Sequence, residues 1–222
     1  MLSTERTNLF DLIGREWASD ETQAVVSSYD GLKVLDLDDW GIYNFLGSGV
    51  KILTDKTGGG NEISEIYIYK TEQSVGRELA KMPCDLRIGQ PQGQVRVLLG
   101  EPYDAHLGHT YPPPIIPGGM CVLPRREEGW DIYHSSQLTD RLKIQPLKPF
   151  LLTVQYPLDR DYIDIRNSEN KTLLLVSKCQ QIGKMILKKW SGDLPQKSGI
   201  SSIEGILEHD NCQRSIYQDW EV

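Results

Sequence analysis

The chain lacks several features that would restrict its location or chemistry. Among its 222 residues there is no run of about 18 apolar residues, so the sequence predicts no transmembrane helix. The N-terminus has no basic region followed by an apolar region, so no signal peptide is predicted. Only four cysteines occur (Cys84, Cys121, Cys179 and Cys212), and no two form a C-x-x-C pair. This spacing favours free thiols in a reducing cytoplasm over a disulfide framework or a zinc site, and we expect no cofactor.

Motifs that mark an active site are also missing. Ser135 and Ser136 lie near His134 and Asp131, but no G-x-S-x-G turn surrounds either serine. Neighbouring residues of a strand point to opposite faces, so these side chains are not expected to form a hydrolytic triad. The glycines at 58–60 lack the G-K-[ST] ending and the following helix of a phosphate-binding loop. The sequence therefore predicts a protein that is not an enzyme.

Two histidines leave other interpretations open. His106 and His109 lie three residues apart in a glycine-bearing loop, and a third ligand such as Asp104 or Cys121 would complete a metal site. The spacing matches no established ligand motif, so we expect a surface loop without a metal. A small hydrolase that uses the His106/His109 loop is the enzymatic alternative, and a non-catalytic structural adaptor is another.

The charge is distributed unevenly along the chain. It carries 31 acidic and 24 basic side chains, a net charge of −7. Residues 1–80 hold 14 of the acidic and seven of the basic side chains, so residues 81–222 are neutral with 17 of each. A negative face repels phosphate and disfavours nucleic-acid binding, whereas it attracts a basic protein partner. Acidity that serves only solubility is the plainer interpretation.

Helix and strand patterns follow one another in the first part of the chain. Apolar residues at helical spacing predict a helix over 8–28, capped by Thr7 and divided near Ser19 or Asp20. A turn at 47–49 and a bulge near Glu65 are also predicted. Three strands are expected, over 40–45, 50–54 and 63–69.

The second part repeats this order. A helix is predicted over 92–99, ended by Gly100 and Pro102, and a long proline-rich loop follows over 103–128. Three further strands are expected, over 130–134, 150–156 and 162–166. Residues 172–190 have apolar residues at helical spacing, although 172–176 would equally suit a strand.

Together these elements predict an α+β fold. Two helix-then-three-strand pseudo-repeats, about 8–70 and 90–167, are expected to form a mainly antiparallel sheet with helices on one side. They make up a predicted domain over 1–170. A C-terminal helical extension, 171–222, is expected to pack on that domain.

Short segments between residues 40 and 166 carry a resemblance to known proteins. They are GVKIL at 49–53, ISEIYIY at 63–69, MPCDL at 82–86, VRVLLGEP at 95–102, WDIY at 130–133 and LTVQY at 152–156. They resemble bacterial immunity-type proteins, including the pyocin and colicin immunity families and those paired with contact-dependent or polymorphic toxins. The predicted unit is also similar to the tandem repeats of β-lactamase inhibitor proteins and of small outer-membrane assembly lipoproteins. The proline-rich loop and the last 50 or so residues depart from that pattern.

A docking surface is predicted just before the first strand. Leucine and aspartate alternate at 35–39, which indicates an extended segment whose acidic face carries Asp36, Asp38 and Asp39. Trp40 and Tyr43 follow closely and would serve as aromatic anchors. An edge strand protected by charge, with no partner, is the alternative interpretation.

The proline-rich loop supplies two more predicted contacts, Tyr111 and Ile115. Exposing apolar residues beside three consecutive prolines is unfavourable, so we expect this loop to pack on the chain or on a partner. The resemblance implies a cytoplasmic immunity protein that neutralises a cognate toxin protein, such as a basic nuclease, by blocking its active site. Neither nucleic acid nor a membrane is an expected partner.

Overall fold

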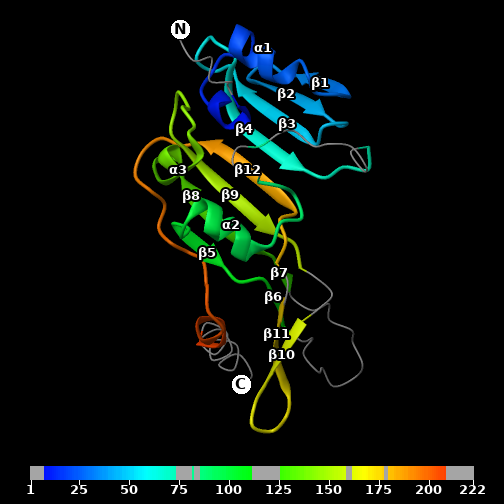
Figure 1. The fold of residues 1–222 in the computed structure, drawn as a ribbon, viewed down its shortest axis with the longest axis vertical. Helices are drawn as coiled ribbons and strands as arrows, with labels where there is room; N and C mark the ends of the chain where they lie inside the picture. The colour runs from blue at the N-terminus through cyan, green and yellow to red at the C-terminus, as the bar shows by residue number, and fades with distance from the viewer. Residues whose placement is uncertain are drawn as a thin grey trace, which may run out of the picture.

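The computed structural model describes residues 8–73, 82, 86–111, 126–158, 162–177 and 180–208. They form an α+β structure built mainly on antiparallel sheets (Figure 1), which confirms the predicted fold class at this level. In this part of the chain, no helix is both long enough and apolar enough to cross a membrane. The helices are η1 (Leu9–Leu12), α1 (Asp20–Val26), α2 (Gln92–Leu99) and α3 (Ser135–Leu142), and residues 203–208 are also helical.

Eight strands form one antiparallel sheet in the order β1-β2-β3-β4-β12-β9-β8-β5. One half is a meander of the first four strands, and the other half runs β5, β8, β9, β12 in chain order. The two halves join where β4 pairs with β12. The strands are β1 (Leu32–Asp36), β2 (Trp40–Phe45), β3 (Val50–Asp55), β4 (Glu62–Tyr69), β5 (Asp104–His106), β8 (Gly129–His134), β9 (Phe150–Tyr156) and β12 (Lys184–Lys189).

The position of β12 corrects the prediction for the C-terminal part. Residues 172–190 contain two strands, β11 (Thr172–Ser177) and β12, so the helix predicted there is wrong and the strand alternative for 172–176 is correct. In the register, Met185 lies opposite Ile68 of β4 on one side and Val154 of β9 on the other. A boundary at residue 170 therefore cuts through the large sheet.

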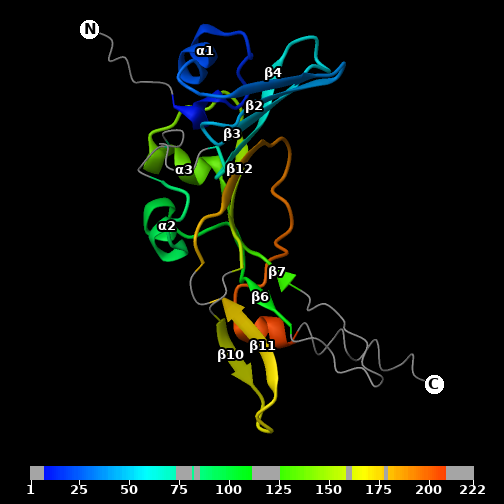
Figure 2. The ribbon, with the colours of Figure 1, turned by 90° about the vertical axis from the view of Figure 1, so that its right-hand side faces the viewer.

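A second, smaller sheet extends from one end of the large one (Figures 1 and 2). Its order is β10-β11-β6-β7, with β10 at Tyr162–Arg166, β6 at His109–Thr110 and β7 at Arg126–Glu127. The strand predicted over 162–166 is therefore present, but it pairs with β11 and lies outside the large sheet. A separate small core of Leu174, Val176 and Ile206 supports this sheet.

The helices cover one face of the large sheet (Figure 2), as predicted. Burial alternates along the strands, for example in β3, because successive side chains point to opposite faces. The inward row of β3 and β4, with Ile52, Ile66 and Ile68, packs into one core with the apolar residues of η1. The main core therefore lies between the sheet and its helices, and the opposite face is only partly buried.

In the first part of the chain, the structure confirms most of the predicted local elements. The helix predicted over 8–28 is divided into η1 and α1, and Ser19 caps α1 by accepting a hydrogen bond from the Thr22 N–H. Asn8, in place of the predicted Thr7, caps η1. The bulge near Glu65 is confirmed by a register shift between β3 and β4.

In the second part, α2 coincides with the helix predicted over 92–99. It ends at Gly100, whose φ of +86° suits glycine. Helix α3 was not predicted, although Leu138 and Leu142 have helical spacing and are both buried.

Candidate functional site

Strand β1 lies at an outer edge of the large sheet and is exposed along its whole length. All five residues are exposed, and among the described strands only β2 pairs with it. Val34 lies opposite Tyr43 and shares the helix-covered face, whereas Leu35 lies opposite Ile42 on the other face. The strand thus extends the sheet beyond its core and presents side chains on both faces.

Large apolar side chains gather on β1, in the turn that follows it and at the first residue of β2. Each of these residues has between 38% and 54% of its surface exposed; they are Leu32, Val34, Leu35, Leu37 and Trp40. Single exposed apolar residues are ordinary on a protein surface, but a group of them on an edge strand favours aggregation or binding. We call residues 32–40 the β1 edge surface.

Three carboxylates accompany these apolar groups. Asp36 forms an ion pair with Lys56, whose ammonium also donates to the Leu37 carbonyl at 2.8 Å. Asp38 and Asp39 are exposed in the turn between β1 and β2. The structure therefore brings the three predicted aspartates together with the apolar residues on one surface.

Trp40 connects this surface to the face of the sheet opposite the helices. It helps to line a surface hollow with Leu53, Asp55 and Glu65. Hydrogen bonds from the Thr57 hydroxyl and N–H lower the pKa of Asp55, so its carboxylate keeps its negative charge. Lys188 and Lys189 also line this hollow, and Lys188 forms an ion pair with Glu65, so the hollow carries charges of both signs.

Tyr43 does not belong to the β1 edge surface, which corrects the predicted set of anchors. Only 8% of the residue is exposed, and its ring stacks on Trp17 with 3.6 Å between ring centroids. Its hydroxyl accepts a hydrogen bond from the Asn61 amide at 3.1 Å. Tyr43 is therefore part of the core, and Trp40 is the exposed aromatic side chain of β2.

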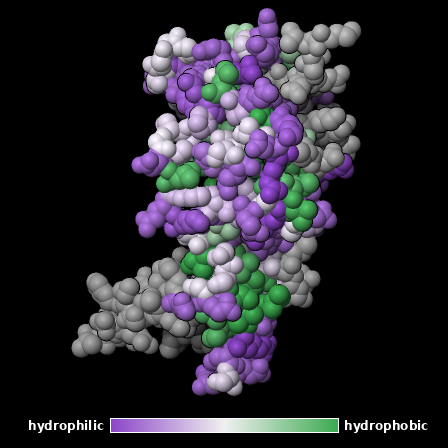
Figure 3. Space-filling model, turned by 60° about the vertical axis from the view of Figure 1, so that its left-hand side comes forward, coloured by the Kyte–Doolittle hydropathy of each residue, from purple (hydrophilic) through white to green (hydrophobic). Residues whose placement is uncertain are grey.

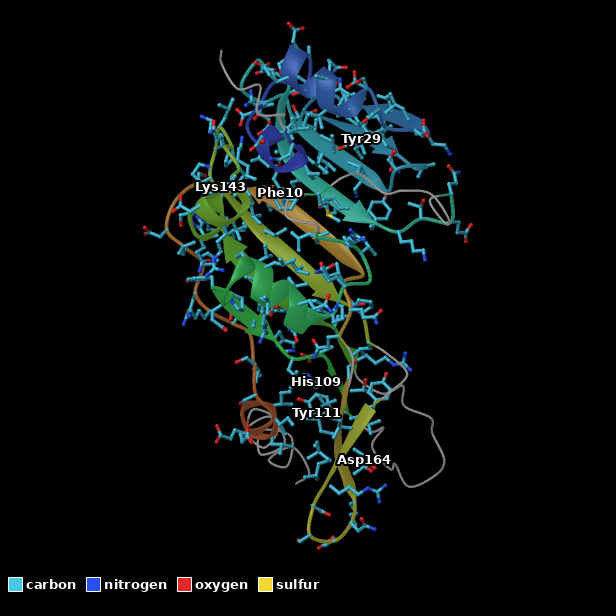
Figure 4. The ribbon with its side chains drawn as sticks, in the orientation of Figure 1. Phe10, Tyr29, His109, Tyr111, Lys143 and Asp164 are labelled. Carbon is cyan, nitrogen blue, oxygen red and sulfur yellow. The ribbon has the colours of Figure 1, made fainter. Side chains whose placement is uncertain are left out.

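The two residues predicted from the proline-rich loop do not join this surface. Tyr111 lies beside His109 near the second sheet (Figure 4), with the rings edge to face at 4.9 Å between centroids. It packs against the small core there, where apolar side chains gather in Figure 3. Ile115 lies outside the described residues.

The sequence interpretation missed Leu32 and Val34. The predicted extended segment begins only at Leu35. The alternation of Leu32, Lys33 and Val34 is a strand signal of three residues, which is too short to stand out. These three residues form a strand because they pair with β2, and this pairing is seen only in the folded structure.

A second cluster of side chains with potential metal-ligand atoms lies where the two sheets meet. His106 of β5, His109 of β6 and Glu127 of β7 each place one potential ligand atom within 4.8 Å of the other two. The His106 Nε2 atom is 3.1 Å from a Glu127 carboxylate oxygen, and the two imidazole rings are 5.4 Å apart between centroids. Both histidines are buried.

The third group of this cluster differs from the two that the sequence suggested. Asp104 accepts hydrogen bonds from the backbone N–H groups of Ser198 at 2.8 Å and Gly199 at 3.2 Å, so its carboxylate holds that segment. Cys121 lies outside the described residues. Glu127 was not considered because it is 18 residues from His109, and only the pairing of β6 with β7 brings it near.

His134, the last residue of β8, and the serines that follow it in α3 do not form a hydrolytic site with Asp131. The His134 Nδ1 atom is 2.7 Å from the Ser136 hydroxyl and accepts the Ser136 N–H, which caps α3. Asp131 lies on the opposite face of β8 and forms an ion pair with Arg96 at 2.6 Å. The Asp131 carboxylate therefore cannot orient His134. This agrees with the expectation that these side chains point to opposite faces of the strand.

Compared with protein families, curated proteins and solved structures, the chain matches none of them. Any function assigned to it therefore rests on its own residues and their geometry, above all on the β1 edge surface.

Proposed function

We propose that this protein is a cytoplasmic immunity-type protein that binds a cognate toxin domain through the β1 edge surface and blocks its active site. The observation that carries the proposal is the combination of five exposed apolar side chains with Asp36, Asp38 and Asp39 in the β1 edge surface, which comprises the edge strand and the turn that follows it. Apolar anchors surrounded by charge are typical of protein-binding surfaces. Exposed aromatic Trp40 is the strongest candidate for an anchor.

The charge of this surface indicates a basic partner. A second copy of the chain would bring the same three aspartates against their own kind, and like charges in contact are unfavourable. A basic surface would instead be attracted before contact and would pair with the carboxylates after it. A nuclease domain, which binds phosphate with basic side chains, has this character.

The arrangement of the large sheet supports the predicted repeat in a modified form. We interpret β1–β4 with α1, and β5, β8, β9 and β12 with α2, as two similar units of a helix followed by four strands. The sequence predicts three strands in each unit: the first lacks β1, and the second lacks β5 and β12 and includes β10, which belongs to the second sheet. In this arrangement the β1 edge surface belongs to the outer end of the first unit, away from the β4–β12 junction.

The proposal predicts that a toxin domain is encoded beside the gene for this protein, and that domain is the partner to be tested. We expect the purified chain to bind that domain tightly and to protect cells that express it. Replacing Val34 by threonine keeps the shape and strand preference of the side chain but adds a hydroxyl, and should weaken binding several-fold. The matched control is Val97→Thr, because Val97 is 79% exposed on α2.

A charge reversal tests the electrostatic part separately. Asp38→Lys combined with Asp39→Lys should weaken binding by roughly tenfold and reduce its dependence on salt. Asp140→Lys makes the same kind of change on exposed α3 and should leave the affinity as it is. Equal affinities for all these variants would overturn the proposed surface, and the absence of any bound toxin would favour the structural adaptor.

A further inference from the structure

The junction between the two sheets carries a cluster of metal-binding side chains that the proposed function does not use. We propose that His106, His109 and Glu127 form a binding site for a divalent transition metal, with Zn²⁺ as its natural occupant. Two imidazoles and one carboxylate are a common ligand set for zinc, whereas calcium and magnesium prefer oxygen ligands alone. The three side chains come from β5, β6 and β7, so a bound ion would tie these strands together.

His109 is already oriented as a zinc ligand. Its Nδ1 atom is 2.7 Å from the Leu107 carbonyl, and because a carbonyl only accepts, Nδ1 must carry the proton and donate it. The lone pair then resides on Nε2, which is the atom that would coordinate the metal. Metal-bound histidines commonly donate their other N–H to a backbone carbonyl, which fixes the ring.

His106 is held in the opposite tautomer. Its Nδ1 atom accepts the Ile200 N–H at 3.1 Å, so the proton of the neutral ring lies on Nε2, which faces Glu127 at 3.1 Å. This contact has an ion-pair distance but lacks the alignment of a hydrogen bond. To coordinate zinc through Nε2, the ring must carry its proton on Nδ1 instead. An Nδ1–H group cannot accept the Ile200 N–H, so metal binding and this hydrogen bond exclude each other.

The burial of the cluster indicates a structural role for the ion. His109 is 1% exposed and His106 is 8% exposed, which leaves little access for a substrate. The apolar core of the second sheet is small, and a small core contributes little stability. An ion that cross-links β5, β6 and β7 would stabilise the sheet further. Three protein ligands leave the fourth tetrahedral position of zinc to water or to another side chain.

The test titrates the full-length chain with Zn²⁺ by calorimetry and with Co²⁺ as a spectroscopic probe. One equivalent of metal should bind, and Co²⁺ should give the strong visible absorption of a tetrahedral site. Glu127→Gln removes the charged ligand with little change of shape and should weaken the affinity by roughly tenfold or more. Its matched control is the exposed neighbour, Glu128→Gln, which should bind metal like the unchanged protein.

Hydrogen exchange supplies an independent readout that does not depend on affinity. Zinc should speed the exchange of the Ile200 amide, because its acceptor is lost, while amides of β6 and β7 exchange more slowly. Failure to bind either metal, or equal binding by the Glu127 and Glu128 variants, would overturn the site. Because the toxin-binding variants lie in the β1 edge surface, away from this cluster, either proposal can fail without the other.

Discussion

At the scale of single residues, Asp131 stands out because its charged carboxylate is fully buried. It is 0% exposed, yet its carboxylate is satisfied by Arg96 at 2.6 and 3.0 Å, by the Tyr156 hydroxyl at 2.9 Å and by the Gln92 amide at 3.2 Å. A buried carboxylate is tolerated only when its charge and its lone pairs have partners. Because Arg96 and Gln92 belong to α2, this network fixes that helix on β8.

Removing the cation should therefore destabilise the fold. Arg96→Ala leaves the Asp131 carboxylate buried without its charge partner, and we expect the free energy of unfolding to fall by about 3 kcal/mol. The control is Val97→Ala on the same helix, where the side chain is exposed and the change should stay within about 0.5 kcal/mol. Urea unfolding followed by circular dichroism measures both. Equal stability of the two variants would show that the network contributes nothing.

Tyrosines with raised pKa values make the protein sensitive to alkaline pH. Burial and then the charge of Asp131 raise the pKa of Tyr156, and burial together with Glu65 raises the pKa of Tyr67 to about 12. Tyrosines of the unfolded chain lose their protons near pH 10, whereas these stay protonated in the folded state. Stability is therefore unaffected below about pH 10 and falls as the pH rises above it.

The tyrosine prediction is measured by urea unfolding between pH 8 and 11. The free energy of unfolding should decrease above about pH 10, and Tyr156→Phe should show a shallower decrease because one such group is gone. That variant is also expected to be less stable at neutral pH by about 1–3 kcal/mol, since Asp131 loses a donor. An identical slope in the variant would contradict the assignment.

At the scale of elements, two strands with similar composition have opposite environments. β1 is exposed along its length at the edge of the sheet, whereas β12 lies between β4 and β9 and buries Met185 and Leu187. Position in the sheet explains the difference, because only an inner strand has neighbours on both sides. β1 is therefore suited to binding, and β12 to stability.

Matched leucine substitutions measure this difference. Leu187→Ala removes a 0% exposed side chain and should lower the free energy of unfolding by about 2–5 kcal/mol. Leu35→Ala makes the same chemical change at a 53% exposed position, and its effect should be about 0.5 kcal/mol or less. Thermal unfolding of both variants gives the comparison. A large loss in the Leu35 variant would mean that β1 is structural and is not a docking element.

At the scale of the whole molecule, strands that lie far apart in the chain share one sheet. β12 comes more than 110 residues after β4, yet their contact is the centre of the eight-stranded sheet. A chain that ends at residue 170 would expose the inner edges of both β4 and β9. We expect it to show no cooperative unfolding transition, because the core loses Met185 and Leu187 together with the strand that carries them.

Circular dichroism and urea unfolding of the shortened chain, beside the full chain, check this expectation. A cooperative transition with native-like strand content in residues 1–170 would instead support the division into a domain and an extension.

The sequence by itself determined features that depend on neighbouring residues. Helical spacing with Gly100 and Pro102 fixed α2, and the alternation at 40–45 and 50–54 fixed β2 and β3. The acidic edge was also visible, because Asp36, Asp38 and Asp39 are close in the chain. These are local properties, because the spacing of apolar residues and the capping of helices involve residues that are close together in the chain.

Tertiary structure alone decided what depends on partners far apart in the chain. Residues 184–189 have apolar spacing that suits a helix or a strand, and pairing with β4 and β9 selected the strand. Stacking on Trp17 buried Tyr43, and the pairing of β6 with β7 brought Glu127 to the histidines. The free energy of a sheet comes from contacts across strands, so the same local pattern has different outcomes in different surroundings.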